Sequence, residues 1–426
     1  MRAMKDSGIE WIGQIPENIN VIRNKYLIKY EKGKLPKDLN TEKIGIPYVG
    51  ASELEDLSGE AEYATYTTDT TIPQCDSSDV LVLWDGARAG LIGTNHKGAV
   101  SSTIVNTLPA KEIDKRFWYW YLKAFQQHLY NRVNGTTIPH MNTYYIEEIA
   151  MLDWKTEEQI RIAHFLDTKC AEIDALIAAK EKTNALLKER RQSIIYEAVT
   201  KGLNPDAPMK DSGIEWIGQI PEHWTVGKTI YGLEMPITDG PHETPQLYSE
   251  GVPFVSAEAV SCGNGKIDFD HIRGYISEEY YDECCKKYIP QINDIYMIKS
   301  GATTGKVAIV DTDSKFTIWS PLAVFRCAGN KCHYKYLYYF LQSDAYQKQV
   351  ESKWSFGTQQ NIGMRTLERL IVCFPTVDEQ KTIADYLDVC CSETDQLITT
   401  NEATIQKLKE YRQSVIYEAV TGKIEV

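Results

Sequence analysis

The chain has 426 residues, of which 43% are hydrophobic and 25% are charged, and its formal net charge is −13. This length predicts two or three domains, and no apolar run approaches the roughly 20 residues of a membrane helix, which argues against a membrane protein. The first residues lack the apolar stretch of a signal peptide and the ten cysteines show no C-x-x-C spacing, so reduced thiols in the cytoplasm are expected.

The negative charge at first argues against a nucleic-acid partner, because phosphate neutralisation drives most such binding. It is unevenly distributed, however. Residues 20–155 and 225–375 each carry 15 Lys and Arg against 17 Asp and Glu, and much of the remaining acidity lies around 206–222 and near the end of the chain. Two near-neutral regions can still bind DNA through a local basic stripe.

The chain contains two internal repeats. Residues 4–17, MKDSGIEWIGQIPE, recur without a mismatch at 209–222. Near the end of each half, RQSIIYEAVT at 191–200 matches RQSVIYEAVT at 412–421. Between these repeats the two halves agree only in outline. The pattern indicates a duplicated frame whose central regions have diverged.

The central region of each half is predicted to be mixed α/β. Both regions show the same order of elements: two apolar strands, a glycine-flanked loop, an aromatic helix and a polar loop. In the first half these are expected at 46–49, 79–84, 86–90, 116–122 and 134–140. In the second half they are expected at 252–255, 294–298, 301–305, 334–341 and 355–361. The aromatic side chains are expected to face the core, with base stacking as the alternative.

Each half ends in a long helix, predicted within 156–202 and 376–426. Each helix starts with an apparent capping box, TEEQ or TVDE, and no Pro or Gly interrupts it before Gly202 or Gly422. A seven-residue apolar pattern predicts that the two helices form a coiled coil, the alternative being amphipathic helices on globular domains. The expected seam contains Leu166, Ile173, Ile177, Leu187 and Ile194 of the first helix and Leu387, Ile398, Ile405, Leu408 and Val415 of the second.

Chain order predicts that these helices are antiparallel. The second central region begins where the first helix ends, so its own helix must run back if the two are to pack. This topology places 4–17 beside the end of the second helix and gives the chain a pseudo-two-fold repeat. The expected fold is therefore α/β, with two globular domains separated by an antiparallel coiled coil. The predicted segments are 1–155, 156–202, 203–375 and 376–426.

Motifs that would indicate an enzyme are incomplete or absent. Gly301–Lys306 resembles a phosphate-binding loop, but its spacer is one residue short and Val307 follows the lysine. Cys327, Cys332 and His333 lie close together without two further ligands at a standard spacing. The sequence has neither a nucleophile elbow nor an amino-methyltransferase motif. We therefore expect neither a catalytic site nor a metal site.

The doubled motifs resemble those of the specificity subunit of type I DNA restriction–modification systems. The resemblance rests on KDSGIEWIGQIPE at 5–17 and 210–222 and on the helix start at 158–167 and 379–388. It covers essentially the whole chain. It implies that each central region is a target recognition domain for one half of an asymmetric bipartite DNA site. The paired helices would set the spacing and dock two modification subunits.

The same resemblance implies that the chemistry lies on other subunits. Modification subunits would carry S-adenosylmethionine and methylate adenine, and restriction subunits would use ATP and magnesium to translocate and cut. This chain would be a cytoplasmic, non-catalytic subunit without a cofactor that recognises double-stranded DNA. The alternatives are a coiled-coil scaffold that binds only proteins and a self-contained nuclease or methyltransferase, whose motifs are missing.

Candidate DNA contacts lie in the loops of the central regions. Arg and Lys pair with guanine, Gln and Asn pair with adenine, and Thr contacts phosphates or the thymine methyl group. The candidates of the first half are Arg88, Lys97, Thr136, Thr137 and His140. Those of the second half are Thr303, Thr304, Lys306, Gln359, Gln360, Asn361 and Arg365. The alternative for each is a solvated turn residue or surface charge.

Overall fold

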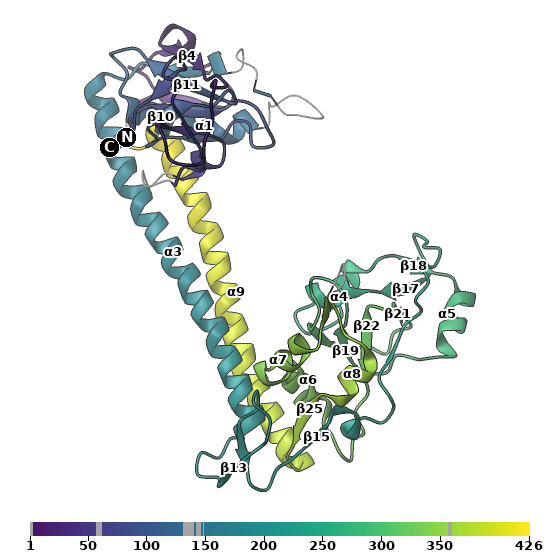
Figure 1. Cartoon of the computed structure of the whole chain (residues 1–426). Helices are drawn as coiled ribbons and strands as arrows, with labels where there is room; N and C mark the ends of the chain where they lie inside the picture. Colours follow the sequence, from purple (N-terminus) through teal and green to yellow (C-terminus); the bar gives the residue numbers. More distant parts are fainter. Residues whose placement is uncertain (1–2, 57–61, 131–139, 142–145, 148, 357–359) are drawn as a thin grey trace. The chain divides into compact units, whose positions relative to one another are not determined.

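The chain folds into two compact units (Figure 1). Unit 1 comprises Met1–Glu181 and Glu402–Val426, and unit 2 comprises Lys182–Asn401. The computed structural model describes residues 3–56, 62–130, 140–141, 146–147, 149–356 and 360–426. Each unit thus contains one copy of the opening repeat, one central region and part of each long helix. Within the described ranges, no helix is both long and apolar enough to cross a membrane.

The two copies of the opening repeat form the same antiparallel hairpin. In unit 1, β1 (Met4–Asp6) pairs with β2 (Gln14–Pro16), and in unit 2, β13 (Met209–Asp211) pairs with β14 (Gln219–Pro221). Each hairpin rests on the end of a long helix. The Tyr417 hydroxyl donates to the Ile12 carbonyl (2.8 Å) in unit 1, and the equivalent Tyr196 hydroxyl donates to the Ile217 carbonyl (3.1 Å) in unit 2. The predicted place of 4–17 beside the second helix is confirmed.

Besides the β1–β2 hairpin, the described residues of unit 1 form two four-stranded sheets and a strand pair, in the orders β6-β5-β10-β7, β4-β11-β8-β9 and β12-β3. The β5–β10 pairing is parallel and the others are antiparallel. The elements are β3 (Val21–Arg23), η1 (Asn24–Tyr26), β4 (Ile28–Lys32), β5 (Ile46–Val49), η2 (Glu53–Glu55), β6 (Tyr66–Thr67), β7 (Gln74–Cys75), β8 (Val80–Leu83), β9 (Ile92–Gly93), β10 (Gly98–Val100), β11 (Ile104–Pro109), α1 (Lys115–Tyr130) and β12 (Ala150–Leu152).

Unit 2 repeats this plan with additional helices. Its sheets have the orders β16-β22-β19-β20, β18-β17-β21, β15-β25 and β23-β24, and β17–β21 is the parallel pair. The elements are β15 (Thr225–Lys228), η3 (Thr229–Gly232), β16 (Thr238–Asp239), β17 (Val252–Val255), α4 (Ala257–Cys262), η4 (Phe269–His271), β18 (Tyr275–Ile276), α5 (Glu278–Cys285), β19 (Ile295–Ile298), β20 (Val307–Ile309), β21 (Thr317–Ile318), β22 (Leu322–Phe325), α6 (Tyr334–Gln342), α7 (Asp344–Ser352), β23 (Ser355–Phe356), β24 (Gln360–Asn361), α8 (Met364–Arg369) and β25 (Ile371–Phe374).

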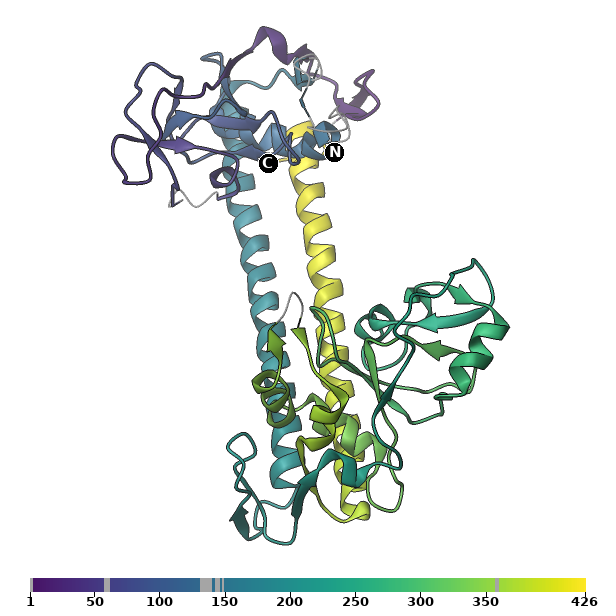
Figure 2. The same cartoon turned by 45° about the vertical axis from the view of Figure 1, so that its right-hand side comes forward.

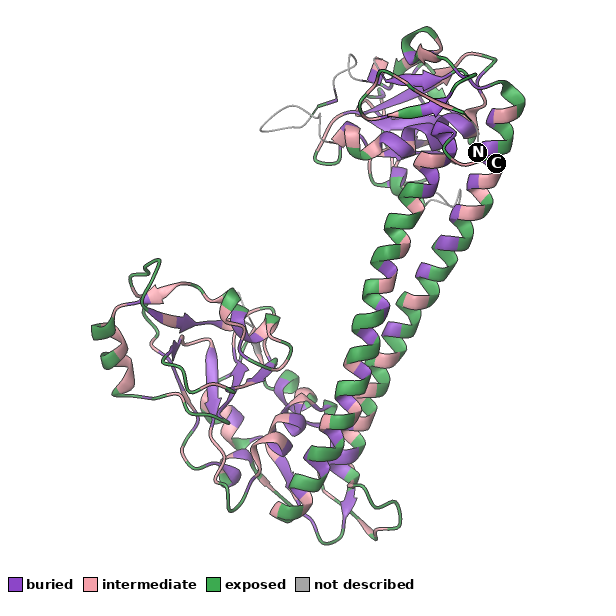
Figure 3. Cartoon of the chain, turned by 180° about the vertical axis from the view of Figure 1, so that it is seen from behind, coloured by how far each residue is buried: buried purple, intermediate pink, exposed green. Residues whose placement is uncertain are grey.

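The core of each unit forms around its predicted strands and aromatic helix. Residues 80–83 of β8 and 295–298 of β19 are buried throughout, as expected for strands that are continuously apolar. All of 117–122 in α1 is buried, so these aromatic rings face the core as predicted. Figure 3 shows the buried residues gathered in the sheets and short helices, while the long helices remain largely exposed.

The long helices α3 (Thr156–Lys201) and α9 (Val377–Thr421) pack antiparallel in each unit (Figure 2). In unit 1, Ile177 packs with Ile405, while Leu166, nearer the start of α3, shares a core with Val415, nearer the end of α9. In unit 2, Ile195 and Val199 near the end of α3 pack with Ile383 and Leu387 near the start of α9. The predicted antiparallel coiled coil is confirmed. Its seam candidates Leu166, Ile173, Ile177, Leu387, Ile398, Ile405 and Val415 are buried, and Leu187, Ile194 and Leu408 are half-buried.

Polar pairs between the helices define their register. In unit 1, Arg412 Nε lies 2.9 Å from Asp174 Oδ1. In unit 2, the Asn401 amide donates to Asn184 Oδ1 (2.9 Å) inside the seam. A shift of either helix along its axis would break the hydrogen bond between the buried Asn184 and Asn401 side chains. The pair therefore favours one register, at some cost in stability. Both helices end at glycines with left-handed backbone, Gly202 (φ 75°) and Gly422 (φ 74°), as predicted.

The capping box predicted at the start of α3 is wrong. The Thr156 hydroxyl donates to the Glu112 carbonyl (3.0 Å), and the Gln159 side chain turns into the core. At α9 the prediction holds in part, because the Thr376 hydroxyl accepts from the Glu379 N–H (3.3 Å). Tertiary contacts therefore replace local capping where a buried amide side chain has better partners.

Candidate nucleic-acid interface

In each unit, the glycine-flanked loop and the later polar loop meet at one edge of the central sheet. In unit 1, the Met141 N–H donates to the Trp84 carbonyl (2.8 Å) and His140 bridges to Asp85. In unit 2, the Gly301 N–H donates to the Gln360 carbonyl (3.0 Å) and Ser300 bridges to Asn361. Candidates that lie about 55 residues apart in the sequence thus become neighbours.

We call these regions the loop edges. The loop edge of unit 1 comprises 84–90 and 140–141 with the turn 51–55 that follows β5. The loop edge of unit 2 comprises 299–306 and 360–362 with the turn 256–258 that follows β17. Both lie at the ends of strands that carry the core, so rigid elements position their side chains.

The two glycine-flanked loops have the same backbone conformation. The Gly90 N–H donates to the Leu83 carbonyl (2.7 Å), and the Gly305 N–H donates to the Ile298 carbonyl (2.8 Å). Both glycines have positive φ, +97° and +94°, which side chains with a Cβ rarely adopt. Two residues before each of these glycines, Arg88 and Thr303 therefore occupy the same place.

Arg88 bridges the loop edge of unit 1. Its Nη2 donates to the Ala51 carbonyl (3.2 Å), and its Nη1 forms an ion pair with Glu55. The Arg88 side chain is still 45% exposed. Because a guanidinium has five N–H donors, Arg88 can hold the turn after β5 and still present donors to a ligand.

His140 is held beside Arg88's loop by a carboxylate that the sequence analysis missed. Asp85 Oδ1 lies 2.7 Å from His140 Nδ1, and Asp85 Oδ2 accepts from Lys32 Nζ (2.9 Å). Partial burial opposes ionisation of Asp85, but the hydrogen bonds from His140 and Lys32 outweigh it and lower the pKa of this carboxyl group. Asp85 is therefore ionised at neutral pH and orients two basic side chains.

The loop edge of unit 2 is open where unit 1 is bridged. A pocket of about 460 Å³ lies between the glycine-flanked loop and the turn after β17. Thr303 is half-buried at its wall, Thr304 Oγ1 donates back to the Gly301 carbonyl (2.7 Å), and exposed Lys306 lies 3.5 Å from the Ser261 carbonyl. Gln360 is half-buried and Asn361 is exposed beside them.

The remaining candidates lie elsewhere or outside the described residues. Lys97 is exposed between β9 and β10, and Arg365 is exposed in the first turn of α8. Thr136, Thr137 and Gln359 lie outside the described residues. Among those that the structure describes, no group of three or more His, Cys, Asp and Glu side chains is arranged to hold a metal ion.

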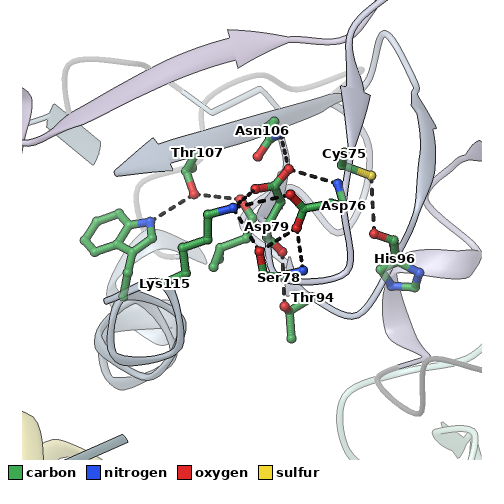
Figure 4. A network of polar contacts seen from close by, with 11 residues as sticks. Cys75, Asp76, Ser78, Asp79, Thr94, His96, Asn106, Thr107 and Lys115 are labelled. Carbon is green, nitrogen blue, oxygen red and sulfur yellow. Dashed lines mark hydrogen bonds and ion pairs between the residues drawn. The ribbon is translucent and has the colours of Figure 1, made fainter. Parts of the chain in front are cut away.

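A buried aspartate anchors the strand behind each loop edge. Figure 4 shows Asp79, just before β8, accepting from Lys115 Nζ (2.6 Å) and Asn106 Nδ2 (3.0 Å). At the same place in unit 2, Asp294 accepts from Arg326 Nε and Nη2, both at 2.8 Å, and from the Tyr288 hydroxyl. These networks fix the start of β8 and β19 and leave the far ends to carry the loops.

The repeated E-Q helix start anchors the aromatic helix in both units. Gln159 accepts from the Asp114 N–H (2.9 Å) and donates to the Trp154 carbonyl (2.7 Å). Gln380 accepts from the His333 N–H (2.7 Å) and donates to the Pro375 carbonyl (3.0 Å) in the same pattern. Both glutamines are buried, so the motif satisfies backbone groups that would otherwise be unpaired.

The aspartate that ends this motif ties the aromatic helix to the long helix. Asp167 accepts from Arg116 Nε (2.6 Å) and Trp120 Nε1 (2.8 Å). Asp388 accepts from the Tyr339 hydroxyl (2.8 Å) and pairs with Lys335. The repeated motif therefore builds the frame, and the loop edges are the parts that differ between the units.

Sequence reasoning missed several residues of the loop edges. Asp85, Glu258 and Trp319 were not among the candidates, although the turns that contain Glu53 and Glu258 can be matched by sequence. The sequence could have pointed to Asp85, because this residue directly precedes the glycine-flanked loop. For Trp319 no local pattern exists, because β21 brings it to the pocket from another part of the chain.

Comparison with known proteins identifies the frame. The family model described as the type I restriction modification DNA specificity domain matches residues 16–188 and again 246–408. The MjaVIII specificity subunit of Methanocaldococcus jannaschii is 27% identical over 97% of this chain and 94% of its own length. The EcoBI specificity subunit of Escherichia coli is 22% identical over 91% of this chain and 82% of its own length.

Solved structures share the fold. A chain from work on complex assembly and conformational transition of the type I R-M system matches with a TM-score of 0.72 at 16% identity, covering 96% of this chain and 99% of that one. The HsdS subunit from Thermoanaerobacter tengcongensis matches with a TM-score of 0.51 at 16% identity, covering 96% and 98%. Since the family model matches well over half of the sequence, and does so once in each half, the chain belongs to the type I restriction–modification DNA specificity family.

Proposed function

We propose that this specificity subunit reads DNA through its two loop edges, each of which contacts one half of an asymmetric bipartite site in double-stranded DNA. One observation carries the proposal. The same backbone in both units presents different side chains at equivalent positions, with Arg88, Asp85 and His140 in unit 1 and Thr303, Ser300 and Asn361 in unit 2. Side chains that differ on a shared frame support the reading of two different half-sequences.

The proposed target recognition domains are 1–155 and 203–375, with spacer helices at 156–202 and 376–426. The repeated packing of α3 and α9 supports a spacer role. These helices, on which we propose that two modification subunits dock, carry exposed apolar side chains. They include Leu176 and Tyr411 in unit 1 and Leu186, Val389 and Leu397 in unit 2.

The chemistry is assigned to partner subunits. Modification subunits would supply S-adenosylmethionine and methylate adenine, and restriction subunits would use ATP and magnesium. The near-neutral charge of each central region supports only modest DNA affinity for this chain alone. A cytoplasmic location follows for a complex that acts on DNA.

The proposal is tested by determining the DNA sequence that the reconstituted complex recognises. The chain and its modification subunits are incubated with a randomised duplex library, and bound or methylated sequences are determined. We expect two unrelated half-sequences at a fixed spacing, with affinity that falls steeply as salt rises. Arg88→Ala should relax bases in one half-site only, by about 1–3 kcal/mol, and Asn361→Ala should relax bases in the other. Salt-insensitive or unselective binding would instead indicate a scaffold for proteins.

A further inference from the structure

The pocket in the loop edge of unit 2 contains an exposed carboxylate. It is lined by Ser256–Glu258, Ser261, Ser300–Thr303, Trp319 and Pro321. Glu258 is exposed, and the Ser256 hydroxyl donates to its Oε2. This hydrogen bond lowers the pKa of Glu258, partial burial opposes the shift, and the charge of Arg273 assists it. The carboxylate is therefore ionised at neutral pH and fixed in direction.

The equivalent turn in unit 1 uses its carboxylates internally. Glu53 is buried and accepts from the Gly50 N–H (3.0 Å) and the Ser52 hydroxyl (2.8 Å). Glu55 is paired with Arg88. In unit 2, Thr303 takes the place of this arginine, and both Thr303 and Glu258 line the pocket. The loop edge of unit 1 therefore holds an arginine paired with a carboxylate, whereas the loop edge of unit 2 holds a carboxylate beside a pocket.

Two cations flank the pocket of unit 2. The Arg273 guanidinium lies over the ring of the lining residue Trp319, 4.3 Å from its centroid, and Lys306 Nζ lies 3.5 Å from the carbonyl of the lining residue Ser261. Both side chains are exposed. Cations on either side of a carboxylate can neutralise neighbouring DNA phosphates, which offsets the repulsion that a lone carboxylate would experience. The arrangement suits a carboxylate that contacts a base edge rather than the backbone.

We propose that Glu258 is a specificity-determining residue that accepts a hydrogen bond from the exocyclic amine of a cytosine or adenine in the half-site read by unit 2. In the major groove, cytosine N4 and adenine N6 are the amine donors, and a carboxylate can only accept. Guanine and thymine present acceptors at these positions and would face Glu258 with like partial charge. This inference rests on the proposed function, since it assigns one base contact within the proposed DNA interface.

The experiment uses the reconstituted complex and its determined site. Each cytosine is replaced singly by 2-pyrimidinone and each adenine by purine, which removes only the exocyclic amine, and the dissociation constant is measured. For the wild type we expect a loss of about 5- to 150-fold at the position that Glu258 reads. In Glu258→Ala that position should become insensitive to the replacement, while all other positions keep their wild-type response. The responsive analogue also tells cytosine from adenine.

Two further variants keep the result interpretable. Glu250→Gln removes an exposed carboxylate just before β17, outside the pocket, and should retain the wild-type response at every position. Thr303→Arg places a guanidinium where Arg88 lies in unit 1, so it should pair with Glu258 and abolish the same response. The inference is overturned if Glu258→Ala and Thr303→Arg complexes keep the full wild-type penalty at every position. A wild-type complex that binds without any sequence preference would instead refute the proposed function itself.

Discussion

The loop edges of the two units show how one frame carries two chemistries. Both place a glycine-flanked loop beside a polar loop with matching backbone hydrogen bonds. In unit 1, Arg88 spans to the turn after β5, where it contacts Ala51 and Glu55. In unit 2, Thr303 is too short to do so, and a pocket of about 460 Å³ remains. The two loop edges therefore differ in charge, with Arg88 exposed in unit 1 and Glu258 exposed in unit 2.

Comparison of the loop edges with the frame indicates where substitutions are tolerated. Frame residues such as Gln159 and Gln380 are buried with matching hydrogen bonds, so substitution would leave backbone groups unpaired. Loop-edge residues such as Arg88 and Glu258 are exposed, and their replacement costs little stability. The duplicated chain can therefore change each loop edge independently while keeping both frames. Three predictions test this separation.

The largest effect is expected at the buried aspartates that anchor the frames. Asp294→Asn should destabilise unit 2 by about 3–5 kcal/mol, because Asp294 is 1% exposed and its loss leaves the half-buried Arg326 without a counter-charge. Asp79→Asn should destabilise unit 1 by about 1–3 kcal/mol, since Lys115 is 36% exposed and can turn to solvent. Hydrogen exchange resolved by segment would measure both units in one chain. Exposed Asp313→Asn is the control and should change neither.

Equal losses of stability in Asp294→Asn and Asp79→Asn would show that the two aspartates stabilise their units equally. The greater burial of the Asp294 ion pair would then have no effect. If Asp294→Asn also destabilised the core of unit 1, the two units would unfold as one cooperative body rather than separately.

An intermediate effect is expected where the two helix pairs differ. Unit 1 packs Ile177 with Ile405, whereas unit 2 buries the hydrogen-bonded pair Asn184 and Asn401. Asn401→Leu should cost about 1–3 kcal/mol because it leaves Asn184 unpaired, while the double change of both residues to leucine should be neutral or stabilising. Urea unfolding measures the three free energies. Thr399→Leu on the exposed face is the control, and additive losses in the double variant would show that the pair is not coupled.

The frame was largely predictable from the sequence because its signals are local. The strand at 46–49 and its partner at 252–255 were expected at their observed positions, and the antiparallel helices followed from chain order. The capping box at Thr156 failed because Gln159 finds partners at Glu112 and Asp114, some 45 residues away. A local motif cannot show such a competing contact.

The loop edges were only partly predictable for the same reason. Arg88 and His140 were found as polar loop residues, but their partners Glu55 and Asp85 lie 33 and 55 residues away. Their meeting depends on sheet register, which no short pattern specifies. Glu258 looks like a solvated charge in the sequence. Only the pocket that it lines in the folded chain distinguishes it.

The smallest effect is a pH dependence confined to unit 1. Asp85 pairs with Lys32 and His140, and these hydrogen bonds hold its pKa below the ordinary value of 3.8 despite partial burial. A carboxyl group whose pKa is lowered by folding adds stability that is fully present above the unfolded value and is lost as pH falls through the folded value. Asp85→Asn should therefore cost unit 1 roughly 1 kcal/mol at neutral pH, and this cost should shrink only below about pH 4.

Unit 2 supplies the matched control, because Ser300 stands at the place of Asp85 and has no charge to lose. Ser300→Ala should change stability by the same small amount at neutral and acidic pH. Segment-resolved hydrogen exchange across this range would measure both variants. A cost of Asp85→Asn that stayed constant into acid would mean that its carboxylate does not stabilise the edge through charge. The basic side chains of unit 1 would then be positioned by backbone register alone.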